Sequence, residues 1–154
     1  MRLEQCMRHV LAAVEAVLGQ FRVADIKRES IVRKDELTLD YEVTTIVGLT
    51  GDANGNIAYS CSNETAKKLA SMLMNGILVT EMNELGRSAI AELFNMISQN
   101  ALFRMSSENA RIDSSQPSVI AGENVMIILT FMSTYCVTYW TPFGKIEVSF
   151  AVEL

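Results

Sequence analysis

The stretch Glu81-Met-Asn-Glu-Leu-Gly-Arg-Ser-Ala-Ile-Ala-Glu92-Leu-Phe-Asn95-Met-Ile97 has the spacing of an amphipathic helix. Its apolar residues recur every three or four positions and so share one side: Met82, Ala89, Ile90, Leu93, Met96 and Ile97. Its polar residues, continuing one turn further, form a stripe on the other side: Glu81, Glu84, Ser88, Glu92, Asn95 and Gln99. We expect a long helix over residues 80–109, capped by Thr80, with its apolar face on a core.

Glu92 and Asn95 stand three residues apart in this stripe, so their side chains should lie about 5–6 Å from each other and point the same way. Asn is about half a kcal/mol less favourable than Ala inside a helix, because its amide competes for backbone hydrogen bonds. A chain of 154 residues can easily contain one such pair on a solvated helix. The spacing alone therefore favours a solvated helix face without a special function. Only the surrounding sequence can indicate that the pair is functional.

The surrounding sequence resembles the CheC, CheX and FliY family of chemotaxis phosphatases. Glu92/Asn95 is the only Glu-x-x-Asn pair in the chain, which is typical of the CheX branch, whose members carry one such helix rather than two. Four further stretches are similar to the family's hairpin, second helix and proline turn: Val47-Gly-Leu-Thr-Gly51, Gly55-Asn-Ile-Ala-Tyr-Ser60, Ser62-Asn-Glu-Thr-Ala66 and Ile112-Asp-Ser-Ser-Gln-Pro117-Ser-Val-Ile-Ala-Gly122. The resemblance covers roughly residues 40–150.

This resemblance implies a phosphatase that removes the aspartyl phosphate of a CheY-like receiver domain, the response regulator of two-component signalling. Asn95 would position the attacking water, and Glu92 would pair with a lysine of the receiver. Glu84, Ser88 and Gln99 would contact the same partner. The Mg²⁺ of the reaction would belong to the receiver, so no cofactor is expected on this chain. The resemblance also implies a homodimer that pairs through strands.

Three residues depart from the family pattern. Phe94 and Gln99 stand where relatives often have glycine, and Gln116 replaces the first proline of a Pro-Pro pair. Phe94 should lie on the flank of the helix, where it can pack internally. Gln99 lies one turn beyond Asn95 on the same face, where it could hinder a close approach. Two alternatives therefore stay open, a protein that binds receivers without turnover and a scaffold dimer in which Glu92 and Asn95 are surface residues.

The order of expected elements predicts an α+β fold, an antiparallel sheet packed against long helices, in one domain over residues 1–154. Residues 3–18 read as a helix ended by Gly19, and Ser62 or Asn63 can cap a second helix ended by Gly76. Strands are expected over residues 22–34, 37–49, 56–61, 110–112, 125–131, 135–140 and 146–152. In the last of these, alternation predicts one buried and one solvated face.

Composition excludes several other functions. The net charge of −5 argues against nucleic-acid binding, which needs a basic surface. No apolar run approaches the roughly 20 residues of a membrane helix. Three scattered cysteines cannot complete a disulfide framework, which fits the cytoplasm. The lone His9 and the absence of a Cys-x-x-Cys motif argue against a metal site.

Overall fold

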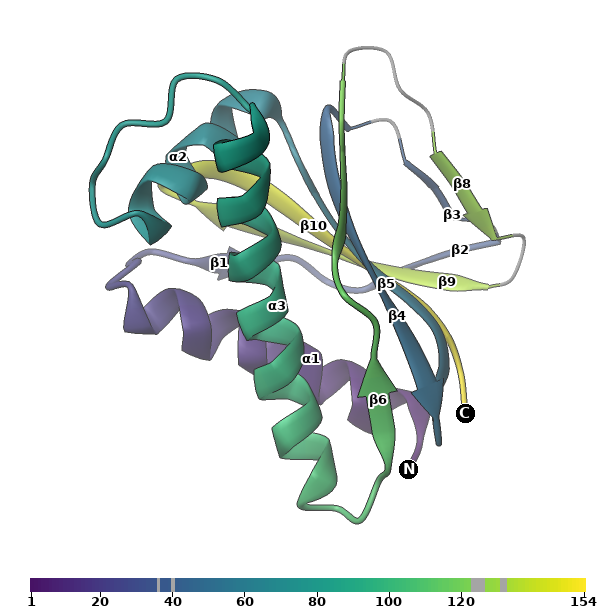
Figure 1. Cartoon of the computed structure of the whole chain (residues 1–154). Coiled ribbons are helices and arrows are strands. Elements are labelled where there is room, and N and C mark those ends of the chain that lie inside the picture. Colours follow the sequence, from purple (N-terminus) through teal and green to yellow (C-terminus); the bar gives the residue numbers. More distant parts are fainter. Residues whose placement is uncertain (36, 40, 123–126, 131–132) are drawn as a thin grey trace.

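The computed structural model describes residues 1–35, 37–39, 41–122, 127–130 and 133–154. Within them are three helices: α1 (Leu3–Gln20), α2 (Asn63–Leu73) and α3 (Glu84–Ser106). The strands are β1 (Lys27–Arg28), β2 (Val32–Lys34), β3 (Leu37–Leu39), β4 (Val43–Gly51), β5 (Asn54–Cys61), β6 (Ile112–Ser114), β7 (Ser118–Ala121), β8 (Ile127–Thr130), β9 (Thr134–Thr141) and β10 (Gly144–Glu153). Figure 1 shows α1 and α3 crossing the same side of the sheet. The predicted α+β class is confirmed.

The main sheet is antiparallel, with the order β1-β9-β10-β5-β4-β6; β2 also pairs with β9, and β7 also pairs with β4. Among the described residues, β3 and β8 pair only with each other, in a separate two-stranded sheet. The strand expected over 37–49 is therefore two strands in different sheets. The strand expected over 125–131 is confirmed for Ile127–Thr130, and its other residues lie outside the described ones.

β10 lies between β5 and β9 near the middle of the sheet. One face carries Ile146, Val148 and Phe150, all buried. This face looks toward the helices, because Tyr139, paired with Ile146, donates a hydrogen bond to a backbone oxygen of α1.

The solvated second face predicted for β10 is wrong. Glu147, Ser149 and Ala151 are at most 7% exposed. Two polar members of this face have partners on other strands. Ser149 Oγ lies 3.4 Å from Cys136 Sγ in β9, and Lys34 Nζ in β2 lies 3.4 Å from a Glu147 oxygen. Such partners make the burial of polar groups tolerable, so alternation in polarity did not mean alternation in exposure.

The ends of the first two helices follow local hydrogen bonds. α1 continues through Gly19, and Arg22 instead adopts a positive φ of 60° after its N–H bonds the Gly19 oxygen. The predicted stop at Gly19 is thus early. Ser62 caps α2 as predicted, its Oγ accepting from the Thr65 N–H at 3.2 Å. Gly76, with φ at 89°, follows the end of α2.

α3 begins later than the sequence indicated. Asn83 is the N-cap, and its Oδ1 accepts from the Gly86 N–H at 3.0 Å. Thr80 and Glu81 precede the helix in an exposed loop, so the predicted Thr80 cap is wrong. Gly86 allows the loop before α3 to pass close to the first turn of the helix, because a Cβ at this position would stand 2.8 Å from the Glu81 backbone oxygen. Within the described residues, no helix combines the length and apolarity that crossing a bilayer requires.

Candidate functional site

The candidate site lies on α3, which contacts α1, α2 and the strands β4, β6 and β7. The inward side of this helix is buried: Ala89, Ile90, Leu93, Phe94, Ile97, Ser98, Ala101 and Met105. Four of the six predicted apolar positions are among them, and Met82 and Met96 pack against the core as partly buried residues. The predicted apolar face is therefore confirmed, although Met82 lies before the helix.

Phe94 fixes this helix on the sheet. Its ring stacks on that of Tyr59 in β5, with 4.6 Å between the ring centroids and 14° between the planes. The Tyr59 hydroxyl lies 2.9 Å from Ser98 Oγ, one turn further along α3. A stacked ring and a buried hydrogen bond thus join two successive turns of α3 to one strand residue. Phe94 is 1% exposed, so it takes no part in the outer surface.

Glu92 and Asn95 lie on the opposite side of α3. Glu92 is exposed and Asn95 is half-buried. Among the described residues, neither side chain has a hydrogen-bond or ion-pair partner. Other polar side chains of the same helix are engaged, since Arg87 bonds the Met82 oxygen at 3.1 Å and Arg104 bonds Asn100 at 2.7 Å. A carboxylate and an amide are therefore presented one turn apart, without a partner in the part of the chain that the structure describes.

The three predicted partner contacts extend this stripe. Glu84 and Ser88 are exposed in the first turns, where they line a shallow hollow together with Asn83 and Leu85. Gln99 is also exposed, but its Nε2 donates to Ser114 Oγ in β6 at 2.9 Å. This bond ties the end of the amide to a strand of the same chain. Glu81, which was also predicted to belong to this stripe, lies in the loop that precedes α3.

Two large apolar residues on the outer side of α3 were missed by the sequence analysis. Leu85 is 57% exposed and Phe103 is 79% exposed. Leu85 lies beside the line of Glu92 and Gln99, because seven residues return a helix to within about 20° of the same direction. Phe103 follows Leu85 by about five full turns of 3.6 residues, so it points the same way as Leu85. The available signal was that these two apolar residues interrupt a polar face.

The remaining chemical groups offer no second reactive centre. Cys6, Cys61 and Cys136 are free and buried. Burial raises the pKa of the Cys6 thiol to about 11 and that of Cys61 to about 12, so few reactive thiolates form near neutral pH. In the described part of the chain, no three His, Cys, Asp or Glu side chains gather as a metal site.

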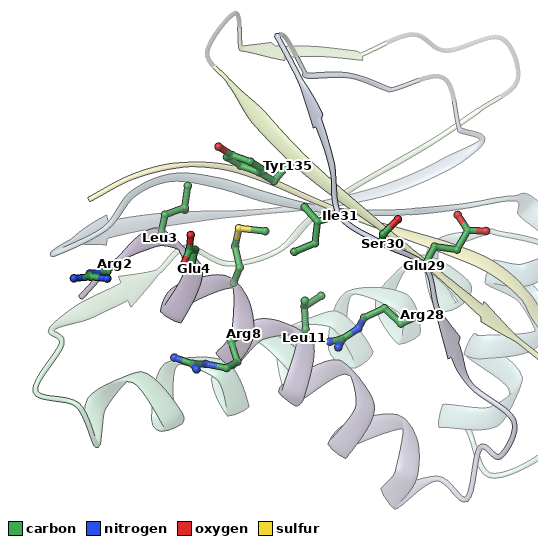
Figure 2. Close-up of a pocket in the computed structure, with 11 residues that line it drawn as sticks. Arg2, Leu3, Glu4, Arg8, Leu11, Arg28, Glu29, Ser30, Ile31 and Tyr135 are labelled. Atoms are coloured by element: carbon green, nitrogen blue, oxygen red, sulfur yellow. The ribbon is translucent and has the colours of Figure 1, made fainter.

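A groove between α1 and the β1–β2 segment is the other hollow of interest (Figure 2). Leu3 and Leu11 rise into it from α1, Ile31 faces them, and Arg8 points away. None of the residues that line it belongs to α3. The residues that line this groove include no side-chain amide that could pair with an acid, so the candidate site is the one on α3.

Comparison with known proteins fits this arrangement. The structure matches that of a CheC-like superfamily protein from Shewanella sp. PV-4 with a TM-score of 0.86 and 17% identity, covering 100% of each chain. The chain thus has the fold of a CheC-like protein. The family model of the chemotaxis phosphatase CheX matches residues 43–139. The chain belongs to the CheX family, and the resemblance seen in the sequence is confirmed.

Two relatives are informative about function. The CheY-P phosphatase CheX of Thermotoga maritima is 32% identical over 91 residues, and the match spans 59% of this chain and 59% of that protein. A chain in the crystal structure of the CheX–CheY–BeF₃–Mg²⁺ complex from Borrelia burgdorferi has a TM-score of 0.75 and 25% identity. That match covers 96% of this chain and 97% of the other.

Proposed function

We propose that this protein is a phosphatase for the aspartyl phosphate of a CheY-like receiver domain. The observation that carries the proposal is the Glu92/Asn95 pair on the outer side of a firmly packed helix, where neither side chain has a partner among the described residues. Family membership supports it, as do the name of the Thermotoga maritima relative and the CheX–CheY complex from Borrelia burgdorferi.

Asn95 positions the attacking water in this proposal. Phosphoryl transfer requires little covalent chemistry from a protein, and catalysis comes from placing the nucleophile in line and stabilising charge. A carboxamide suits this task, because its oxygen accepts a hydrogen bond from water while its NH₂ group donates one. Since the Asn95 amide has no partner within the described chain, it is available to a water molecule in a complex.

Glu92 pairs with the active-site lysine of the receiver. Its exposed carboxylate lies one turn before Asn95, so a single ion pair would set the register of α3 against the partner. The receiver supplies the Mg²⁺ that neutralises charge on the phosphoryl group, so the proposed reaction requires no metal ligand from this chain. Glu84 and Ser88 contact the receiver beside the first turns of α3, and Gln99 does so beyond Asn95.

The packing of α3 makes it a suitable mount for this chemistry. Catalytic groups must stay within about 0.5 Å of their productive positions. Phe94 on Tyr59, together with the Ser98–Tyr59 bond, holds the turn that carries Asn95. Such a protein would work in the cytoplasm, where receivers are phosphorylated, and as a homodimer with both α3 helices exposed.

A second candidate function is binding of the receiver without turnover. The observation in its favour is Gln99, an exposed residue one turn beyond Asn95 on the docking side. Its bond to Ser114 fixes the amide end in place, where it would keep a partner further from α3. A non-catalytic binder would form the complex and leave the phosphate intact.

The test is the decay of a radiolabelled phosphorylated receiver from the same genome, with and without this protein. Acceleration by catalytic amounts of the protein is expected. Decay at the intrinsic rate, with a complex detected by calorimetry, would support the non-catalytic binder instead. Neither acceleration nor a complex with any receiver of that genome would overturn both functions.

A further inference from the structure

Leu85 and Phe103 flank the proposed site on the same side of α3. Leu85 precedes Glu92 by seven residues, or about 10 Å along the helix axis. Phe103 follows Asn95 by eight residues, or about 12 Å. Both side chains are more than half exposed. They are the two large apolar side chains of α3 that are exposed, and they stand on a face that otherwise carries polar residues.

The separation of the two residues fits one folded partner. Leu85 and Phe103 lie about 27 Å apart along the axis. A domain of about 100 residues has a radius of gyration near 13 Å, and so a diameter of about 30 Å or more. A receiver that engages Glu92 and Asn95 between them therefore extends over both ends of the stripe.

We propose that Leu85 and Phe103 are apolar docking anchors that determine how tightly the phosphorylated receiver binds across α3. The inference rests on the proposed function and adds that different residues of α3 act on the phosphoryl group and hold the receiver. The central polar pair acts on the phosphoryl group, and the two ends supply the apolar contact area. Phe103 contributes more, because aromatic residues that become buried at an interface carry a large share of binding energy.

The test combines steady-state dephosphorylation with binding of the beryllofluoride-activated receiver. Phe103→Ala should raise KM and the dissociation constant about tenfold, with kcat within about twofold of wild type. Leu85→Ala should show the same pattern with a smaller rise. Phe103→Leu, which keeps an apolar side chain, should recover part of the lost affinity.

Ile31→Ala is the matched control. Ile31 is 50% exposed and lies between β1 and β2, at the far edge of the sheet. Truncating it removes a similar apolar surface and should change neither constant.

Unchanged KM and binding in the Leu85 and Phe103 variants, with an active wild type, would overturn the anchors and leave the phosphatase function intact. A wild type that neither binds nor dephosphorylates receivers would instead overturn the function and the anchors together. Light scattering of Phe103→Ala gives a third result, since a change in mass would assign this face to contact between copies of the chain and overturn the receiver anchor.

Discussion

Phe94 and Asn95 are neighbours in sequence with opposite roles in α3. The Phe94 ring lies inside, stacked 4.6 Å from the Tyr59 ring, whereas the Asn95 amide faces outward without a partner among the described residues. The 100° turn between consecutive helical residues separates an anchoring side chain from one that faces outward. The stability of α3 and its chemistry can therefore be altered independently.

Phe94→Ala should lower the free energy of unfolding by about 3–5 kcal/mol, because a fully buried ring is removed and a cavity remains. Urea denaturation followed by circular dichroism measures this loss. Phe103→Ala removes the same ring from the same helix at an exposed position and should stay within about 0.5 kcal/mol of wild type. Equal losses in the two variants would contradict the inward placement of Phe94.

Asn95→Ala should reduce receiver dephosphorylation on the order of 100-fold or more, because the water loses its positioning group. The fold should remain intact, since Ala is the better helix former. Asn100→Ala is the control, as it removes an amide of the same helix that already bonds Arg104. Wild-type turnover by Asn95→Ala would show that this amide does not position the nucleophile.

Glu92→Gln should weaken both binding and turnover, because the variant keeps the shape and hydrogen-bonding capacity of Glu92 but loses its charge. The activity of the wild type should fall as salt rises, while that of Glu92→Gln should depend less on salt. Receiver decay measured from 50 to 500 mM salt (about one decade, over which screening becomes strong) makes this comparison. A variant with the wild-type rate and salt dependence would remove Glu92 from the site.

Buried thiols and phenols set an alkaline limit to stability. Burial raises the pKa of Cys6 to about 11, and those of Cys61 and Tyr139 to about 12. These groups are neutral in the folded chain but ionise at lower pH once unfolded, near 8.5 for a thiol. Their contribution is therefore fully present below about pH 8.5 and is lost as pH rises toward 11–12.

Urea denaturation in the presence of a reductant, at pH 8 and at pH 10.5, should show this fall in the free energy of unfolding. Cys61→Ala should show a smaller fall between the two pH values, because one buried ionisable group is gone. A free energy that is constant or rising over this interval would contradict the predicted linkage.

The sequence predicted the features that depend on periodicity and failed where a particular contact decides. Spacing alone placed Ala89, Ile90 and Leu93 on the core side of α3. The start of the helix depended on Asn83, whose cap is formed with Gly86 and competes with the Thr80 alternative. The second face of β10 looked solvated because Ser149 is polar, yet its hydroxyl lies near Cys136 on the neighbouring strand. Such a cross-strand neighbour depends on register, which polarity does not reveal.

In the candidate site, too, sequence pattern predicted some features, and contacts formed only in the folded chain determined others. A motif of two residues, read with its surroundings, predicted Glu92 and Asn95 as the site. The structure places both on the outer side of α3, and their role stays a prediction. That Gln99 would bond Ser114 could not be predicted, because the two residues meet only when β6 returns beside α3. The exposure of Leu85 and Phe103 likewise depends on which neighbours cover α3.

The last prediction concerns assembly. In the part of the chain that the structure describes, β3 and β8 pair only with each other, and a two-stranded ribbon is marginally stable alone in water. β8 belongs to the apolar run Val125–Phe131, and an apolar strand at a sheet edge is a liability that pairing with a second copy can remove.

We expect a symmetric homodimer that pairs through these strands and leaves both α3 helices free, each able to dock one receiver. Light scattering at micromolar protein should give twice the chain mass of 17.1 kDa. Leu39→Lys in β3 should shift the mass toward the monomer, because a charge at a paired apolar strand opposes association, while Glu153→Lys at the exposed end of β10 serves as the charge-changing control. A wild-type mass near that of one chain would contradict the dimer.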